Sequence, residues 1–253
     1  SPSRGLGDVY KRQLDTLLIF TTKGKVFSMK VYEIPESGKQ ARGKLISNLI
    51  KLSSDEKVST VIKVREFEEN KKLFFITRDG KVKKTDLTLF ANINKAGIRA
   101  LTLNGEDELT YIGLTSGNHK NEIFIATRNG VAIRFSEEDV RSMGRTAAGV
   151  KGIDLRKDDI VVAAAIIDPA IGEEEFNKLS VLTVTEEGYG KRTKLGEYRV
   201  QSRGGKGIIN LKMNEKTGKI VDVKIVDNET EVMLITSEGT LIRTRVDSIS
   251  VIG

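Results

Sequence analysis

The segment Leu73-Phe74-Phe75-Ile76-Thr77-Arg78-Asp79-Gly80 joins a short apolar run to a threonine, two polar residues and a glycine. The run is too short for an ordinary helix and rich in aromatic and branched residues, so we interpret it as a buried strand. The glycine supplies the positive φ of a tight turn, and a second strand follows it. The segment therefore predicts a β-hairpin.

The same pattern occurs five times along the chain, and its glycines lie between 50 and 58 residues apart. The five turns are Thr21-Thr22-Lys23-Gly24, Thr77-Arg78-Asp79-Gly80, Thr127-Arg128-Asn129-Gly130, Thr185-Glu186-Glu187-Gly188 and Thr236-Ser237-Glu238-Gly239. A repeat of this period indicates one supersecondary unit used repeatedly.

Each of the first four repeats also carries a second glycine, an apolar segment behind it and a further apolar strand. The second glycines are Gly43, Gly97, Gly149 and Gly207. Four strands in about 50 residues are typical of a propeller blade, so we expect an all-β, propeller-like fold of four-stranded blades. The expected blades span about 14–70, 71–119, 120–176, 177–228 and 229–253, four of them complete or nearly so and the fifth truncated. Residues 1–13 show no strand pattern, and we interpret them as a linker or a cloning or sequencing scar.

The composition narrows the class of protein. Lysine and arginine total 42 against 35 acidic residues, a net charge of +7 that favours a polyanionic partner, although a solvated basic surface gives the same sum. There is no cysteine, which excludes disulfides and thiolate metal sites. No apolar run reaches the length of a membrane span and no secretory signal is recognisable, so we expect a cytoplasmic protein without membrane contact.

Catalysis finds little support in the sequence. The only histidine, His119, lies in a polar loop, where an exposed structural residue is more common than a catalytic or metal-binding one. Acidic pairs such as Asp158-Asp159 fall at expected hairpin turns, where solvated carboxylates are ordinary. We therefore predict no catalytic residue, no metal site and no cofactor in this chain.

Basic residues recur at fixed places in the repeat. Four residues after the turn glycine stand Ser28, Lys84, Arg134, Arg192 and Arg243, and further basic residues lie beside them and near the second glycine. We expect these side chains to form a basic track for a nucleic acid; ordinary solvated strand ends are the alternative. Strand alternation conflicts with the track, because the apolar Val82 two residues after its glycine shares a face with Lys84. The predicted DNA-binding residues are Arg42, Lys44, Lys83, Lys84, Lys95, Arg99, Arg134, Arg145, Lys151, Lys191, Arg192, Arg203, Lys206, Arg243 and Arg245.

The glycine-rich segment Gln201-Ser202-Arg203-Gly204-Gly205-Lys206-Gly207 indicates contact with phosphate. Its spacing is not that of a Walker loop, so we expect Arg203, Lys206 and the loop amides to contact a phosphodiester backbone and not a nucleotide. Single strands are usually held by aromatic stacking, and this chain has no Trp and 6% aromatic residues. Duplex DNA is therefore the expected partner, with weak sequence specificity set by how easily the DNA bends.

Several segments together resemble the C-terminal domain of the A subunit of bacterial DNA gyrase, a type IIA topoisomerase. They are Ser28-Met29-Lys30-Val31-Tyr32-Glu33-Ile34-Pro35, Lys83-Lys84-Thr85, Val140-Arg141-Ser142-Met143-Gly144-Arg145, Gly149-Val150-Lys151-Gly152-Ile153, Gly188-Tyr189-Gly190-Lys191-Arg192-Thr193 and Gly239-Thr240-Leu241-Ile242-Arg243-Thr244-Arg245-Val246. The resemblance runs in order from about Leu14 to the end of the chain. It implies a β-pinwheel, usually of six blades, whose basic rim wraps duplex DNA.

The resemblance also implies an enzyme around this chain. The full protein would use ATP and Mg²⁺ through other domains, assemble as two A and two B subunits, and introduce negative supercoils. In that family the heptapeptide Gln-Arg-Arg-Gly-Gly-Lys-Gly belongs to the first blade, and the resemblance implies that this blade lies outside the present sequence. The near match here, Gln201–Gly207 with Ser202 in place of Arg, lies in what would be the fifth blade.

Three other interpretations are compatible with the pattern. The C-terminal domain of the A subunit of topoisomerase IV resembles this family but typically has fewer blades and degenerate heptapeptides. A protein-interaction propeller would show an exposed apolar patch in place of basic positions in register. An enzyme in its own right would need an acid-base or nucleophile constellation that the sequence lacks.

Overall fold

The computed structural model describes residues 14–35, 45–117 and 120–252. Over these residues the chain is an arrangement of antiparallel strands in five sheets, with short 3-10 helices and one α-helix, so the all-β prediction is confirmed. The described residues group into two compact units. The first unit comprises those in 14–77, 81–117 and 141–150, and the second comprises those in 78–80, 120–140 and 151–252.

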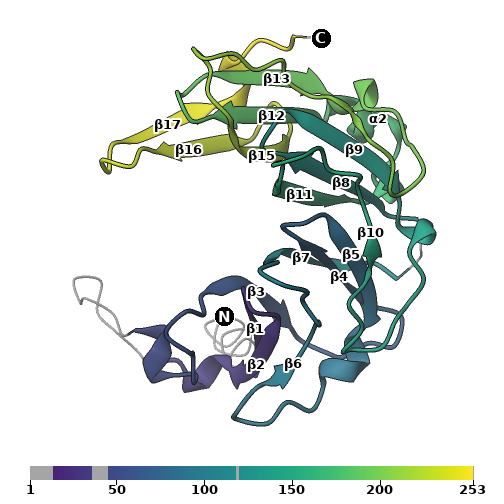
Figure 1. The fold of residues 1–253 in the computed structure, drawn as a ribbon, viewed down its shortest axis with the longest axis vertical. Coiled ribbons are helices and arrows are strands. Elements are labelled where there is room, and N and C mark those ends of the chain that lie inside the picture. The colour runs from purple at the N-terminus through teal and green to yellow at the C-terminus, as the bar shows by residue number, and fades with distance from the viewer. Residues whose placement is uncertain (1–13, 36–44, 118–119, 253) are drawn as a thin grey trace, which may run out of the picture. The chain divides into compact units, whose positions relative to one another are not determined.

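All five predicted hairpins are present (Figure 1). They are β1 (Thr16–Thr21) with β2 (Lys25–Lys30), β4 (Lys72–Thr77) with β5 (Lys81–Asp86), β8 (Glu122–Thr127) with β9 (Val131–Ser136), β12 (Ser180–Thr185) with β13 (Gly190–Lys194), and β16 (Glu231–Ile235) with β17 (Leu241–Arg245). Equivalent residues face one another in each repeat: Phe74 lies opposite Lys84, and Phe124 lies opposite Arg134.

The threonine and the glycine of the motif close each turn together. In the third repeat the Gly130 N–H donates to the Thr127 carbonyl at 3.2 Å, and the Val131 N–H donates to the Thr127 hydroxyl, also at 3.2 Å. Gly130 has φ +88, and a Cβ placed there would stand 2.3 Å from the Leu211 carbonyl oxygen. Glycine is therefore required twice, for the left-handed conformation and for the close approach of the next repeat.

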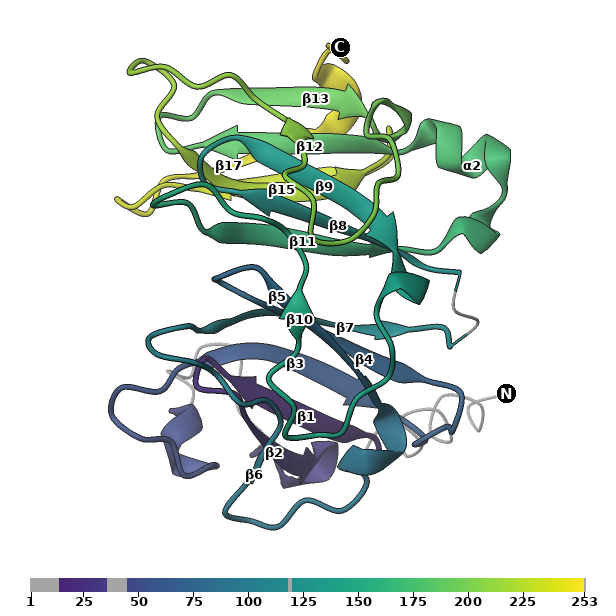
Figure 2. The same ribbon diagram turned by 45° about the vertical axis from the view of Figure 1, so that its right-hand side comes forward.

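A third strand in each of the first four repeats pairs with the first strand of its own hairpin. These strands are β3 (Val58–Val64), β7 (Leu109–Thr115), β11 (Val161–Ile167) and β15 (Ile220–Val226). The short strand behind the second glycine pairs differently: β6 (Ile98–Arg99), β10 (Val150–Lys151) and β14 (Ile208–Ile209) each join the second strand of the preceding hairpin (Figure 2). The sheet orders are β3-β1-β2-β6, β10-β5-β4-β7, β11-β8-β9-β14, β13-β12-β15 and β16-β17.

This exchange differs from the simple expectation of four strands from one repeat. Its physical basis is visible at Gly207, which has φ +70 and where a Cβ would stand 2.5 Å from the Ala132 carbonyl oxygen of β9. A side chain at this position would push the returning segment off the preceding hairpin. The second glycine thus permits the exchange, and neighbouring repeats become linked by main-chain pairing.

A short 3-10 turn follows the second strand of every hairpin. The turns are η1 (Val31–Glu33), η3 (Leu87–Phe90), η4 (Glu137–Asp139), η6 (Leu195–Glu197) and η7 (Val246–Ser248). Two further 3-10 helices, η2 (Ile46–Asn48) and η5 (Pro169–Ile171), and the helix α2 (Glu173–Lys178) lie in the connections. We call the first set the post-hairpin turns.

Each unit has its own apolar core between sheets. In the first unit the rings of Phe20, Phe75 and Phe90 meet with centroids 5.7 to 6.1 Å apart. In the second unit Phe124 and Tyr198 meet edge to face at 5.1 Å. In the hairpins β4–β5 and β8–β9 most side chains of both strands are buried, and these include charged side chains.

Candidate nucleic-acid interface

The basic residues four positions after the turn glycine are mostly inside the fold. Lys84, Arg134 and Arg192 have 3%, 7% and 4% of their surface exposed, whereas Arg243 on β17 is exposed. The predicted repetition of charge is therefore real, but three of its four members have almost no surface to offer to a ligand.

Arg134 is held by a set of hydrogen bonds across the second unit. Its Nε donates to the Glu122 carboxylate at 2.6 Å, and its Nη1 donates to the carbonyl oxygens of Leu195 and Tyr198 at 3.3 and 3.0 Å. The guanidinium also lies 4.8 Å from the ring centre of Phe176. The charge is thus paired and the donors are directed at the next post-hairpin turn, as a buried arginine requires.

Arg192 repeats the arrangement one repeat later. Its Nη1 donates to the carbonyl oxygens of Val246 and Ile249 at 3.0 and 3.1 Å, and its Nη2 donates to the Asn228 side chain. In both cases the side chain reaches from a β-strand to the post-hairpin turn of the following repeat. We call this contact the carbonyl clasp.

Lys83 is also buried, in the first unit. Its ammonium donates to the carbonyl oxygens of Ala100 and Arg145 at 2.5 Å each and lies 4.7 Å from the ring centre of Phe75. Burial, helped by the nearby Arg145 charge, lowers the pKa of Lys83 to about 7. A lysine in this setting carries much less charge near neutral pH than a lysine on the surface.

The expectation that Lys83, Lys84, Arg134 and Arg192 lie on an exposed basic track is wrong. Lys83 and Lys84 on β5 and Arg134 on β9 stand on central strands, with the exchanged strand on one side and the first strand of the hairpin on the other, and their side chains are buried. Arg192 lies on β13, an edge strand, and is nevertheless buried, with its guanidinium engaged in the carbonyl clasp. The conflict at Val82 was the signal of this burial, because it placed an apolar residue on the same face as Lys84.

The other predicted basic residues keep at least part of their surface. Lys95, Arg99, Lys151, Lys206, Arg243 and Arg245 are exposed, and Arg145, Lys191 and Arg203 are half-buried. Some of them carry local ion pairs: Lys151 with Asp154 at 2.8 Å, Arg245 with Asp247 at 2.5 Å, and Arg243 with Glu231. Such surface pairs are weak and can be exchanged for phosphate. Contact of these residues with DNA stays a prediction.

The glycine-rich segment is tied into the protein. Arg203 donates from Nε to the Asp139 carbonyl at 3.0 Å and from Nη1 to the Lys151 carbonyl at 2.5 Å. The N–H groups of Gln201, Arg203 and Gly204 donate to the Arg134 carbonyl, the Asp139 carboxylate and the Gly152 carbonyl. These three amides are therefore engaged within the chain and are not available to a phosphate, while Lys206 remains exposed, and contact of this segment with a phosphodiester backbone stays a prediction.

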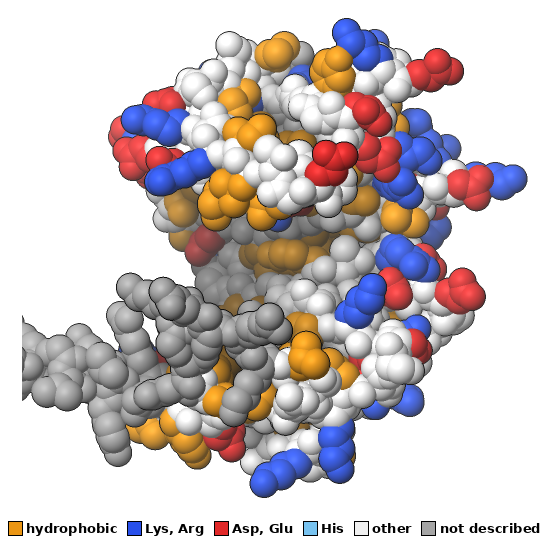
Figure 3. Space-filling model, turned by 90° about the vertical axis from the view of Figure 1, so that its left-hand side faces the viewer, with side chains coloured by type: hydrophobic (Ala, Val, Ile, Leu, Met, Phe, Trp, Pro, Cys, Tyr) orange, Lys and Arg blue, Asp and Glu red, His pale blue; other side chains and the backbone are white. Residues whose placement is uncertain are grey.

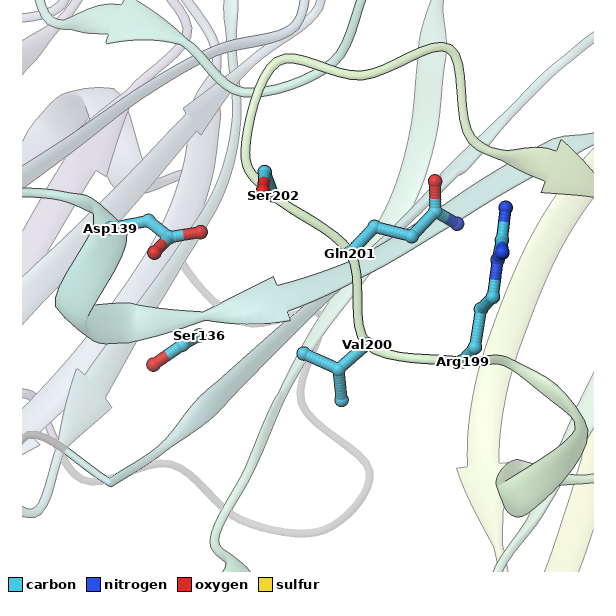
Figure 4. A pocket seen from close by; sticks show the side chains of 6 residues that line it. All are labelled: Ser136, Asp139, Arg199, Val200, Gln201 and Ser202. Atoms are coloured by element: carbon cyan, nitrogen blue, oxygen red, sulfur yellow. The ribbon is translucent and has the colours of Figure 1, made fainter.

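An open cavity of ≈ 540 Å³ lies beside this segment, lined by Ser136, Asp139, Arg199, Val200, Gln201 and Ser202 (Figure 4). The exposed Arg199 stands at one side of it and Asp139 at the other in that view. Arg199 was not among the predicted residues. The signal that could have found it is its place in the repeat, because Arg199 precedes the short strand at Ile208 by the same interval that separates Arg141 from Val150.

Figure 3 shows lysine and arginine side chains at the surface of each of the two compact units, interspersed with acidic and hydrophobic side chains. Arg42, Lys44 and His119 lie outside the described residues.

Across the described part of the chain, no group of three or more His, Asp or Glu side chains is arranged to hold a metal ion. None of the helices described is long and apolar enough to cross a membrane.

A family comparison gives these observations a context. The family model described as "DNA gyrase C-terminal domain, beta-propeller" matches residues 15–65, 71–116, 121–168, 180–227 and 230–253. The chain belongs to this family. The five matched segments coincide with the five hairpin repeats, so the resemblance seen in the sequence is confirmed.

Curated relatives carry the gyrase name. The A subunit of DNA gyrase from Salmonella typhimurium is 45% identical over 94% of this chain, and that of Lawsonia intracellularis is 44% identical over 92%. The chain spans 26% and 28% of the length of these two relatives.

Solved structures share the fold. A C-terminal domain of DNA topoisomerase IV matches with a TM-score of 0.84 at 26% identity, over 98% of this chain and 80% of that one. A DNA gyrase A C-terminal domain matches with a TM-score of 0.77, also at 26% identity, over 95% of this chain and 75% of that one.

Proposed function

We propose that this chain is a non-catalytic module that binds and wraps duplex DNA within the A subunit of a DNA gyrase. The observation that carries the proposal is the match of all five repeats to the gyrase C-terminal domain family. The net charge of +7 and the exposed lysines and arginines of the loops support it, because phosphate contacts dominate the affinity of proteins for DNA.

The contact residues of the proposed interface are the exposed and half-buried ones. They are Lys95, Arg99, Arg145, Lys151, Lys191, Arg203, Lys206, Arg243 and Arg245. Bending 20 to 30 base pairs by 40 to 90° costs about 1–6 kcal/mol, so several repeats must each contribute contacts to offset it. A repeated arrangement of cations supplies such contacts.

The role of the whole protein follows from the same proposal. The wrap would present a second duplex to a strand-passing gate elsewhere in the gyrase, and ATP and Mg²⁺ would act through other domains and through the B subunits. Two A and two B subunits would form the assembly, in the cytoplasm. The names of the curated relatives support this context.

The A subunit of topoisomerase IV is the second candidate, because the C-terminal domain of that enzyme has a TM-score of 0.84 against this chain. The two solved domains have the same sequence identity to the chain, whereas the curated relatives named above are gyrases at 44–45% identity. The sequence relatives therefore favour gyrase.

The test is topological. The chain is added to nicked circular DNA, the nick is sealed by ligase, the protein is removed, and the linking number is read on a gel. Wrapping predicts a linking-number change that grows with the amount of chain per circle. Binding without any such change would contradict wrapping, and the absence of binding in 50 mM salt would leave the protein-interaction propeller as the better assignment.

A further inference from the structure

Arg199 is an exposed arginine whose backbone is fixed on both sides. Before it, Tyr198 is buried, and its hydroxyl donates to the Asn210 side chain at 2.6 Å. After it, Val200 forms a bridge with Arg134, and the Gln201 N–H donates to the Arg134 carbonyl at 2.8 Å. The side chain is therefore exposed while the backbone that carries it is held on both sides.

The carbonyl clasp of Arg134 completes this support. Its guanidinium holds the carbonyl oxygens of Leu195 and Tyr198, which are the first residue of the post-hairpin turn η6 and the residue that closes it. Both the main chain and the side chain of Arg134 thus act on the few residues that carry Arg199. A rigid attachment lowers the entropy lost when a surface side chain binds.

The surroundings of Arg199 suit an anion. In Figure 4 its guanidinium and the Gln201 amide extend toward the same side of the segment, away from the Asp139 carboxylate. That carboxylate already accepts a hydrogen bond from the Arg203 N–H at 3.1 Å. The Gln201 Nε2 has no hydrogen-bond partner within the described residues, but it is buried, so the exposed guanidinium of Arg199 is the donor that this segment presents to a ligand.

We infer that Arg199 contacts a backbone phosphate of duplex DNA and that the buried Arg134 is the positioning residue that holds it in place. The inference rests on the proposed function. In this inference the DNA contact is made by the exposed Arg199 and not by the buried Arg134, which supports it.

The chain contains a matched comparison for Arg134. Arg192 makes the same clasp on the next post-hairpin turn, through Val246 and Ile249, but the residue after that turn is Ser250 and not an arginine. A merely structural effect of losing a clasp should appear at both sites. An effect that passes through Arg199 should appear at Arg134 alone.

The first experiment measures duplex affinity against salt for Arg199→Ala and, as a control, Arg156→Ala, an arginine in the connection before β11. Loss of one phosphate contact should make the slope of log K against log salt shallower by about 0.9 for Arg199→Ala. The control should keep the slope of the unmodified chain. Equal slopes for both variants would overturn the inference.

The second experiment is a double-mutant cycle on DNA affinity. Arg134→Lys should weaken binding in the unmodified chain and have no further effect in the Arg199→Ala background, whereas Arg192→Lys should have the same effect in both backgrounds. Melting curves of the two lysine variants check folding; if Arg134→Lys does not fold, Glu122→Gln, which loosens the same guanidinium, takes its place. Additive effects of Arg134→Lys and Arg199→Ala would overturn the positioning role.

The experiments distinguish a failure of the proposed DNA-binding function from a failure of the assignment of Arg199. If the unmodified chain does not bind duplex DNA in a salt-dependent way, the proposed function fails. If it binds but Arg199→Ala matches the Arg156→Ala control, only the assignment of Arg199 fails.

Discussion

Arg134 and Arg243 occupy the same position in their hairpins but differ in burial and therefore in their expected contribution to stability. Arg134 on β9 and Arg243 on β17 each pair with a glutamate on the neighbouring strand, Glu122 and Glu231. The first pair is mostly buried, with side-chain exposures of 8% for Arg134 and 17% for Glu122, whereas the second is open to water, with 66% for Arg243 and 44% for Glu231. These two repeats therefore share the same pair, and burial decides its energetic weight.

This difference in burial predicts a large loss of stability for one arginine-to-alanine substitution and a small loss for the equivalent one. Arg134→Ala should lower the free energy of unfolding by about 3–5 kcal/mol, because it leaves the Glu122 charge and two carbonyl oxygens without their donor in a buried site. Arg243→Ala should leave the stability nearly unchanged, because its pair is exposed. Urea unfolding of both variants measures the difference, and a similar small loss at both sites would show that the clasp contributes little.

Lys83 makes a second residue-scale prediction, on pH. Its pKa is about 7 in the folded chain against 10.5 for an ordinary lysine, so between these values the unfolded state holds a proton that the folded state does not. Stability should consequently rise as pH increases from about 7 toward 10.5, by up to about 1.4 kcal/mol per pH unit from this group. Lys83→Met should remove that rise.

The measurement is the free energy of unfolding at pH 7, 8 and 9 for the unmodified chain and for Lys83→Met. Lys95→Met, at an exposed site, serves as the control and should follow the unmodified chain. Parallel pH dependences for all three proteins would contradict the assignment of a largely neutral Lys83.

At the scale of single elements, the hairpin turns test how closely the repeats approach one another. Gly130 and Gly188 occupy the same position in their turns, with φ +88 and φ +77. A Cβ at Gly130 would stand 2.3 Å from a main-chain oxygen of the next repeat, whereas a Cβ at Gly188 would meet nothing within 4 Å. Gly130 and Gly188 therefore share the left-handed backbone conformation, but only Gly130 has a neighbouring repeat close to the position of a Cβ.

Gly188→Ala should therefore lower the stability only by the left-handed term, about 1–2 kcal/mol. Gly130→Ala should lower it by more, because the Leu211 carbonyl must move and the hydrogen bonds of Asn210 and Leu211 to the Gly130 carbonyl are strained with it. Thermal unfolding compares the two. Equal losses would mean that the exchanged segment is not held tightly against the turn.

The elements also separate what the sequence could predict from what it could not. The hairpins followed from apolar runs ending in Thr and Gly, because those residues close the turn by themselves. The exchange of β6, β10 and β14 did not follow, since the spacing of a short strand is the same whichever hairpin it joins. The burial of Lys84 and Arg134 was missed because alternation says which face a side chain takes and not whether that face is covered.

At the scale of the whole molecule, main-chain exchange and carbonyl clasps link consecutive repeats, and two of the exposed cations, Arg99 on β6 and Lys151 on β10, lie on exchanged strands. Within the first unit β6 joins β2, and within the second unit β14 joins β9. The second unit adds the clasps of Arg134 and Arg192. The buried charges therefore stabilise the fold, and the exposed charges are available for the proposed contact with DNA.

We expect the exposed cations, and not the buried ones, to bind the phosphates of duplex DNA. The most direct test measures duplex affinity between 50 and 200 mM salt for the unmodified chain and for a variant with Lys95, Arg99, Arg199 and Lys206 changed to Ala, all of them exposed. The affinity of the unmodified chain should fall by roughly 10³ to 10⁵ if about 6 to 10 phosphates are engaged, and the variant should show a slope shallower by about 3.6 with an unchanged melting temperature. A salt-insensitive affinity, or a variant whose slope equals that of the unmodified chain, would contradict the claim.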